Sequence, residues 1–438
     1  MRRAGALLIL VLLMGWLERI PPGNAPGAHT AMVAGLLLLS GYLAGYLLAA
    51  VRLPRITGYL CVGLLMGPHI LGFLTADTVA ELGFLNELAV TFIALAAGGE
   101  LKIAELRQRM KVILMTIAGL TLIVCSLVAL FIFLARPLLP FTNAFSTVQL
   151  LAVALLFGVL AVARSPSSAI AIINECRARG PFTEAALGVT VAMDVLVIIF
   201  FAGAISFCEA VMPPVVPIDL GFIASLGAEI LTGIGAGLVI GLVLAYYIDR
   251  VQVNTSILLL GTALLVTYLS HGLGVYLQET FAVTVHLEPL LICVTAGFTV
   301  QNYSRQGGKF IEAIEAVSLP VYVLFFALAG AGLDLGALRK TWAISLMLVA
   351  VRGGAIFLGA YTGGRLGGDP PRFNRIAGMA FLTQAGVSLG LAMEVVRRFP
   401  EWGNDFTTVV VAVIAINQMI GPIAMKQALV RSGEAQDA

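Results

Sequence analysis

The chain has 438 residues, of which 60% are hydrophobic and only 11% are charged. Soluble domains carry about 25% charged residues, so this composition excludes an ordinary soluble enzyme. The net charge of +2 is too balanced to indicate nucleic acid or an acidic partner. The five cysteines are scattered without metal-binding spacing, and no cofactor is expected. Because a spanning helix needs about 20 apolar residues, the length predicts a polytopic membrane protein.

The first 28 residues precede the predicted membrane spans. Arg2 and Arg3 are followed by a short apolar run at residues 4–17, and then by prolines, glycines and small residues. This pattern fits either a signal peptide or an extra N-terminal helix. Both alternatives stay open.

Apolar runs separated by short polar breaks predict thirteen transmembrane helices, or fourteen with the N-terminal segment. The fold class is therefore all-α. The predicted spans cover residues 30–51, 55–74, 82–101, 111–135, 147–176, 183–208, 219–248, 254–275, 284–301, 314–335, 341–364, 374–396 and 406–430.

Basic residues alternate between the predicted loops. One set of loops holds clusters such as Lys102, Arg107 and Arg109, whereas the loops around Asp77 and Pro213 hold none. Basic loops stay on the cytoplasmic side of a membrane. The C-terminus, with a short tail at residues 431–438, is therefore predicted to be cytoplasmic.

Two pairs of segments indicate an internal repeat. Residues 96–106 align with residues 328–338, and residues 161–175 align with residues 380–394. The pairs join the third span to the tenth and the fifth to the twelfth, each seven spans further along the chain, so the members of a pair run through the membrane in opposite directions. The implied plan is two inverted six-helix repeats joined by a linker helix. The first repeat covers residues 30–208, the linker helix residues 219–248 and the second repeat residues 254–430.

Each predicted repeat contains a segment that interrupts its helix. Pro166 cannot donate a backbone hydrogen bond, and Gly386 weakens a helix interior. The two breaks cover residues 164–168 and 383–386. Inverted repeats with interrupted helices are typical of secondary transporters, whose half-helix ends meet near the middle of the bilayer and favour ions.

Asp194 stands at the centre of the sixth predicted span, with no basic residue within ten positions in sequence. A carboxylate at that depth costs about 2.5–3.5 kcal/mol. Desolvation favours its neutral state, so it can hold a proton or exchange the proton for a small cation. This predicts one-for-one exchange. The alternative is an Asp that pairs with Arg352 or Arg164 for folding alone.

Three further charged residues lie within or near predicted spans. Arg352 lies in the eleventh span and needs a partner there. It is expected to cap the backbone carbonyls of a half helix. The alternatives are that it pairs with a carboxylate or that its charge tunes the protonation of Asp194. Arg164 stands where the first half of the fifth span would end, where its charge offsets the negative helix end. Glu100 is expected to be interfacial or exposed to water.

Four segments carry a resemblance to a known family: residues 55–72 (RITGYLCVGLLMGPHILG), 98–101 (GGEL), 163–175 (ARSPSSAIAIINE) and 191–198 (VAMDVLVI). Over residues 30–430 the chain resembles the second branch of the monovalent cation:proton antiporter family. This branch includes bacterial sodium/proton antiporters and glutathione-gated potassium efflux systems.

The resemblance implies a dimerisation domain and a six-helix core domain with two crossing discontinuous helices, which move by elevator-like alternating access. It implies a homodimer in the lipid of a bacterial inner membrane. Asp194 looks like the family's carboxylate that binds the monovalent cation and the proton. The polar residues at the unwound crossings are implied to help bind the ion: Ser165, Ser168, Thr383 and Gln384. The family's Gly-x-Glu-Leu pattern also matches Glu100, whose role stays open.

The chain departs from the family at two positions. Electrogenic relatives have an acidic residue just before the binding Asp and a lysine on the span that corresponds to residues 314–335. Here the first position is Met193, that span has no lysine or arginine, and the Asn of electroneutral relatives is also missing. A single carboxylate predicts electroneutral exchange of Na⁺, or K⁺, for H⁺.

Two other functions are weighed against the antiporter. A sodium-coupled organic-anion symporter of related inverted-repeat fold would use the hydroxyl and amide groups at both breaks as ligands. An intramembrane enzyme would need a catalytic cluster, and no HExxH or GxSxG motif is present. We therefore expect a transporter rather than an enzyme.

Overall fold

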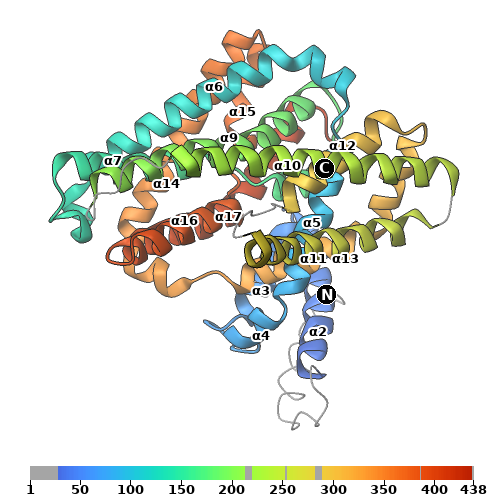
Figure 1. Cartoon of the computed structure of the whole chain (residues 1–438), viewed down its shortest axis with the longest axis horizontal. Coiled ribbons are helices and arrows are strands. Elements are labelled where there is room, and N and C mark those ends of the chain that lie inside the picture. The colour runs from blue at the N-terminus through green and yellow to red at the C-terminus, as the bar shows by residue number, and fades with distance from the viewer. Residues whose placement is uncertain (1–27, 213–219, 252–253, 282–288, 385, 437–438) are drawn as a thin grey trace. The chain divides into compact units, whose positions relative to one another are not determined.

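The computed structural model describes residues 28–212, 220–251, 254–281, 289–384 and 386–436 (Figure 1). Within these ranges every regular element is a helix, so the predicted all-α fold class is confirmed. The predicted signal peptide or extra helix lies outside the described residues, except for its last residue.

Eight helices in the described ranges are long and apolar enough to cross a membrane. They cover His29–Ala50, Leu106–Leu134, Thr147–Cys176, Pro181–Val211, Ile230–Arg250, Gly307–Ala331, Leu335–Gly367 and Gly403–Ser432. Three shorter apolar helices accompany them, at Arg55–Met66, Gly83–Gly99 and Thr255–Ser270. This pattern agrees with the predicted polytopic membrane protein.

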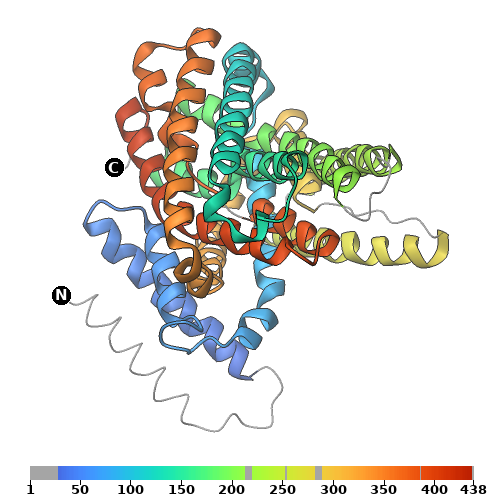
Figure 2. The same cartoon turned by 90° about the vertical axis from the view of Figure 1, so that its left-hand side faces the viewer.

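The helices form two compact units, whose elements can be followed by their labels in Figure 1 and by their colours in Figure 2. Among the described residues, unit 1 comprises residues 28–102, 170–175, 229–251, 254–281 and 289–333. It contains α2 (Ala28–Ala50), α3 (Arg55–Met66), α4 (Ala76–Glu81), α5 (Gly83–Gly99), most of α10 (Leu220–Arg250), α11 (Thr255–Phe281), α12 (Pro289–Tyr303) and α13 (Gly307–Ala331).

Among the described residues, unit 2 comprises residues 103–169, 176–212, 220–228, 334–384 and 386–436. It contains α6 (Ile103–Leu134), the short 3-10 turns η1 (Arg136–Leu138) and η2 (Pro140–Thr142), α7 (Thr147–Val162), the start of α8 (Pro166–Cys176), α9 (Pro181–Val211), α14 (Leu335–Gly367), α15 (Pro371–Ala380), α16 (Gly386–Arg398) and α17 (Gly403–Ser432).

Glycines set the helix packing of unit 1. A Cβ on Gly63 of α3 would overlap the carbonyl oxygen of Ala327 in α13, and a Cβ on Gly330 of α13 would overlap the carbonyl oxygen of Leu60 in α3. The helices α5 and α12 are joined in the same reciprocal way, through Gly98 and Gly297. Small residues therefore bring backbones into direct contact, as is common between membrane helices.

In unit 2, α6 packs along α14, and Gly119 and Gly359 face each other across this contact. The end of α17 is tied to the start of α9. The Glu434 carboxylate accepts hydrogen bonds from the backbone N–H groups of Phe182 and Thr183, both at 2.8 Å, and from the Thr183 hydroxyl at 2.7 Å. A carboxylate at a helix N-terminus satisfies orphan N–H donors and the helix dipole.

Two helix boundaries differ from the predicted spans, because hydropathy alone does not show where proline ends a helix or where a helix continues through charged residues. The helix predicted over residues 55–74 ends at Met66, because Gly67 and Pro68 follow it. The helix predicted to begin at residue 111 begins at Ile103. Basic residues in its first turns are good helix formers, although they interrupt an apolar run.

Candidate functional site

Two helices are interrupted in the middle, and both interruptions lie in unit 2. The first interruption lies between the end of α7 at Val162 and the start of α8 at Pro166. The second lies between the end of α15 at Ala380 and the start of α16 at Gly386. Each break leaves backbone carbonyl and N–H groups without helical partners, and these groups need other partners when buried.

Serine side chains begin α8. Ser165 accepts a hydrogen bond from the backbone N–H of Ser168 at 3.2 Å and donates to the Ser168 hydroxyl at 3.0 Å. Pro166 occupies the first helical position, where a missing N–H costs nothing. Ser165 is thus the N-cap of α8, and both hydroxyls are buried beside the break.

Arg352 on α14 connects the two breaks. Its Nε donates to the carbonyl of Ala161 at 2.9 Å, its Nη2 to that of Ala163 at 3.1 Å, and its Nη1 to that of Leu382 at 3.0 Å. The side chain is fully buried. One guanidinium therefore supplies donors to carbonyls at the end of α7 and in the second break, where helix ends carry partial negative charge.

Arg164 lies inside the first break and is 1% exposed. Its Nη1 donates to the carbonyls of Ala161 at 3.2 Å and Ala163 at 3.3 Å, the same two oxygens that Arg352 uses. Within the described ranges, its Nε and Nη2 have no hydrogen-bond partner. Two guanidinium groups thus share one helix end.

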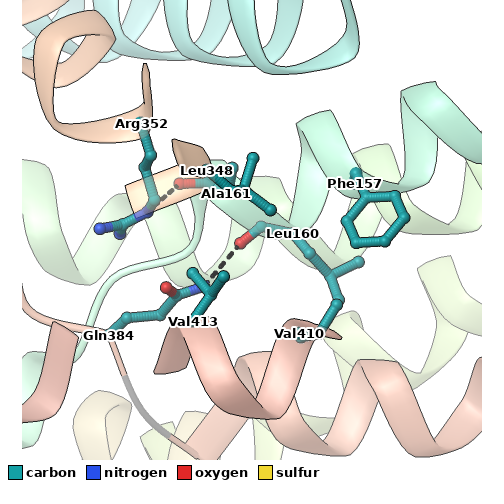
Figure 3. A pocket seen from close by; sticks show the side chains of 8 residues that line it. All are labelled: Phe157, Leu160, Ala161, Leu348, Arg352, Gln384, Val410 and Val413. Carbon is teal, nitrogen blue, oxygen red and sulfur yellow. Dashed lines mark hydrogen bonds between the residues drawn. The ribbon is translucent and has the colours of Figure 1, made fainter. Parts of the chain in front are cut away.

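Amide side chains link the second break to its neighbours. Gln384 Nε2 donates to the carbonyl of Leu160 in α7 at 3.1 Å and to the Ser388 hydroxyl at 3.2 Å. Gln384 Oε1 accepts from Nδ2 of Asn417 on α17 at 2.9 Å. Figure 3 shows Gln384 and Arg352 bonded to the last turn of α7.

Asn417 is not among the site residues that were predicted from the sequence, although its position in a membrane span could have indicated it. It is 1% exposed and stands beside Gln418 in a largely apolar stretch of α17. A polar side chain within a membrane span is costly and is usually functional or paired. Asn417 carries no charge and does not lie at a predicted break, so neither of those two signals marks it.

Thr383 begins the polar part of the second break. Its hydroxyl is buried, and among the described residues it has no hydrogen-bond partner. Gly421 of α17 touches its backbone closely enough that a Cβ there would collide with the Thr383 Cα. The small residue lets α17 approach the unwound chain.

Asp194 lies near the middle of α9 and is half-buried. This helix packs against α6, α7 and α16, so it runs beside helices that flank both breaks. Its neighbour Met193 is fully buried, and the Met193 sulfur accepts a hydrogen bond from the Thr121 hydroxyl of α6 at 3.7 Å. Met193 therefore has a packing role on the α6 side of the helix.

Glu100 belongs to unit 1, whereas the other site residues named above belong to unit 2. It caps the C-terminal end of α5, where its backbone N–H donates to the carbonyl of Ala96 at 3.2 Å. Its side chain is half-buried. Glu100 therefore lies at the end of a helix rather than inside one.

A small pocket adjoins Arg352 and Gln384 (Figure 3). Apolar side chains supply the rest of its lining: Phe157, Leu160, Ala161, Leu348, Val410 and Val413. In the described part of the chain, no cluster of three or more His, Cys, Asp or Glu side chains is arranged to hold a metal ion. The chemistry available at the breaks is that of hydroxyl, amide and carbonyl oxygens, with Asp194 on an adjoining helix.

The chain is similar to known membrane antiporters in sequence and in fold. Residues 35–430 match the family described as the transmembrane sodium/hydrogen exchanger. The chain is 24% identical over 410 residues to the Na(+)/H(+)-K(+) antiporter GerN of Bacillus cereus, covering 89% of this chain and 94% of GerN.

Solved structures show the same fold. The sodium proton antiporter MjNhaP1 of Methanocaldococcus jannaschii at pH 8 matches with a TM-score of 0.63 and 19% identity, covering 92% of this chain and 96% of that one. An electron-microscopy map of MjNhaP1 gives a TM-score of 0.67 at the same identity, covering 91% and 94%. These relatives are transporters, and nothing in them supports an organic-anion symporter. The chain therefore belongs to the sodium/hydrogen exchanger family of integral membrane cation:proton antiporters.

Proposed function

We propose that this protein exchanges one monovalent cation, Na⁺ or K⁺, for one proton at Asp194, by elevator-like alternating access and without net charge movement. The observation that carries the proposal is the joining of two interrupted helices within unit 2, with the helix of Asp194 packed beside them. Interrupted helices that meet near the membrane midplane are typical of ion sites in secondary transporters.

The helix boundaries support thirteen spans in two inverted repeats. The predicted offset of 232 residues relates the last residue of α5, Gly99, to that of α13, Ala331. It also relates the first residue of α6, Ile103, to that of α14, Leu335. Each remaining predicted span overlaps one helix or two helices separated by a break. The predicted linker at residues 219–248 overlaps α10.

The packing supports the same plan. If α2, α3, α5 and α6 are equivalent to α11, α12, α13 and α14, the contact of α3 with α13 is equivalent to that of α12 with α5. Both contacts use reciprocal glycine-to-carbonyl packing, at Gly63 and Gly330 and at Gly98 and Gly297. The contact of α6 with α14 pairs equivalent helices through Gly119 and Gly359.

In the proposed cycle, Asp194 is neutral when it holds a proton and is neutralised when it holds a monovalent cation. A charged, empty site faces a large desolvation cost in the membrane. The site therefore crosses readily only when occupied, which couples the two fluxes. Oxygen atoms of Ser165, Ser168, Thr383 and Gln384 are proposed to replace part of the cation's hydration shell.

Charge counting supports the electroneutral stoichiometry. Met193 replaces the acidic residue that would provide a second charge, and its side chain packs toward α6. Arg352 donates to three backbone carbonyls and Arg164 to two. These contacts support structural, charge-compensating roles for the two arginines.

We further propose that the protein is a homodimer in a bacterial inner membrane with a cytoplasmic C-terminus. The alternation of basic loops supports this orientation. The curated relative GerN comes from a bacterium, and the chain covers nearly its whole length.

The proposal is tested with purified protein in liposomes that carry a pH gradient and an internal pH-sensitive dye. Na⁺, Li⁺ or K⁺ is added outside, and the rate at which each cation collapses the gradient is recorded. Asp194→Asn should abolish the response to every cation. Asp405→Asn is the matched control, because Asp405 is exposed in the first turn of α17.

Competition for one carboxylate gives a further signature. Below the pH at which Asp194 releases its proton, the KM for the cation should rise about tenfold for each unit that the pH falls. An active Asp194→Asn variant would contradict the proposed site. A cation-independent proton leak in the wild type would contradict antiport.

A further inference from the structure

The first break buries more positive charge than its described surroundings compensate. Arg164 and Arg352 are both at most 1% exposed, and both donate to the carbonyls of Ala161 and Ala163. The end of a helix offers roughly half an elementary negative charge. Across the described ranges, neither guanidinium forms a salt bridge. A buried charge without a counter-charge is strongly disfavoured.

The unsatisfied donors of Arg164 lie on one edge of its guanidinium group. Its Nη1 is occupied by the two carbonyls, whereas Nε and Nη2 have no partner among the described residues. In a guanidinium, Nε–H and one N–H of Nη2 point in parallel from the same edge. This edge binds a single anion through two charge-assisted hydrogen bonds.

The uncompensated charge of the buried Arg164 side chain favours an anion over a neutral ligand. A water molecule on the free edge would satisfy the hydrogen bonds but would leave the charge uncompensated.

The burial of Arg164 and of its neighbours Ala163 and Ser165, each at most 2% exposed, favours a small anion. Organic ligands usually occupy pockets of several hundred cubic ångströms, whereas a halide needs little more room than a water molecule.

We propose that the Nε and Nη2 edge of Arg164 binds a small inorganic monovalent anion of the chloride class. The anion is a resident counter-ion of the first break, distinct from the cation and proton that are exchanged. It compensates the two arginines and holds the unwound segment between α7 and α8 in place. This site goes beyond the proposed exchange reaction.

The test uses the full-length protein in detergent, heated in equal concentrations of sodium chloride, sodium bromide or sodium gluconate. Both halides should raise the unfolding midpoint of the wild type above that in gluconate by at least about 2 °C, because a ligand that binds only the folded state stabilises it. Arg164→Met removes the donors and should remove the difference. Arg365→Gln, at an exposed position on α14, should retain it.

Equal midpoints in chloride and gluconate for the wild type would overturn the proposal, as would an undiminished halide effect in Arg164→Met. If Arg164→Met does not fold, anomalous scattering from bromide-soaked crystals of the wild type decides. A bromide peak within hydrogen-bond distance of Arg164 Nε supports the site. A side-chain carboxylate on that edge, or no bromide there, overturns it. Both measurements report anion binding, so their failure leaves the proposed cation exchange untouched.

Discussion

The close helix contacts of unit 1 and the interrupted helices of unit 2 solve different physical problems. Around Gly63 and Gly98 the helices are continuous and satisfy their own backbone hydrogen bonds, so two backbones can touch without polar side chains. At the breaks of unit 2 the backbone groups lose their helical partners, and side chains such as Arg352 and Gln384 replace them. The two fully buried arginines of the described residues, Arg164 and Arg352, therefore lie where the helices are interrupted.

The largest expected effect comes from removing the donor that serves both breaks. Arg352→Met leaves three buried or partly buried carbonyls without this partner and should lower the free energy of unfolding by about 3–5 kcal/mol. The measurement is the thermal unfolding midpoint of the purified protein. Arg352→Lys should be intermediate, because a single ammonium cannot reproduce the planar fork. A variant as stable as the wild type would refute this role for Arg352.

The next effect tests the backbone contacts of unit 1. Gly63→Ala would place a Cβ against the carbonyl oxygen of Ala327 and force α3 away from α13. Overpacking of this kind should cost about 1–3 kcal/mol, measured by thermal unfolding. Gly35→Ala is the matched control, because a Cβ on Gly35 of α2 meets open space. If both variants behave alike, the close contact is not needed for stability.

A smaller effect is expected from the amide that the sequence analysis missed. Asn417→Ala removes the donor to Gln384 Oε1 and should cost about 1–2 kcal/mol. If Gln384 helps to bind the cation, the KM for the cation should rise as well. Asn404→Ala, on the exposed side of the same helix, should change neither quantity. A normal KM and a normal midpoint in Asn417→Ala would remove Asn417 from the site.

The smallest expected effect is on the pH dependence of stability. It arises from Asp369, which lies outside the membrane spans between α14 and α15. Burial raises the pKa of this carboxyl above its usual value, with Glu434 adding to the shift and Arg109 opposing it. The folded state then holds the proton more tightly than the unfolded chain. Its contribution to stability therefore grows as the pH falls through the folded pKa, and is lost as the pH rises through it. Asp369→Asn should flatten this part of the curve of unfolding midpoint against pH, and an unchanged curve would argue against it.

Sequence reasoning predicted much of the fold because hydropathy and helix breakers act locally. Pro166 directly follows the first break, and Gly386 begins the helix after the second. Hydropathy could not show that α6 begins at Ile103, because the basic residues of its first turns hide a helix that continues beyond the apolar run. It also could not show which residues meet. The contacts of Arg352 with Leu382, and of Asn417 with Gln384, join residues at least 30 positions apart in the sequence.

The most direct test of the central claim is exchange in liposomes whose membrane potential is clamped with K⁺ and valinomycin, with Na⁺ as the added cation. The account predicts a rate of pH-gradient collapse that is independent of the clamped potential and absent in Asp194→Asn. A rate that changes steeply with potential would contradict electroneutral exchange at a single carboxylate. Unaltered exchange in Asp194→Asn would contradict the site itself.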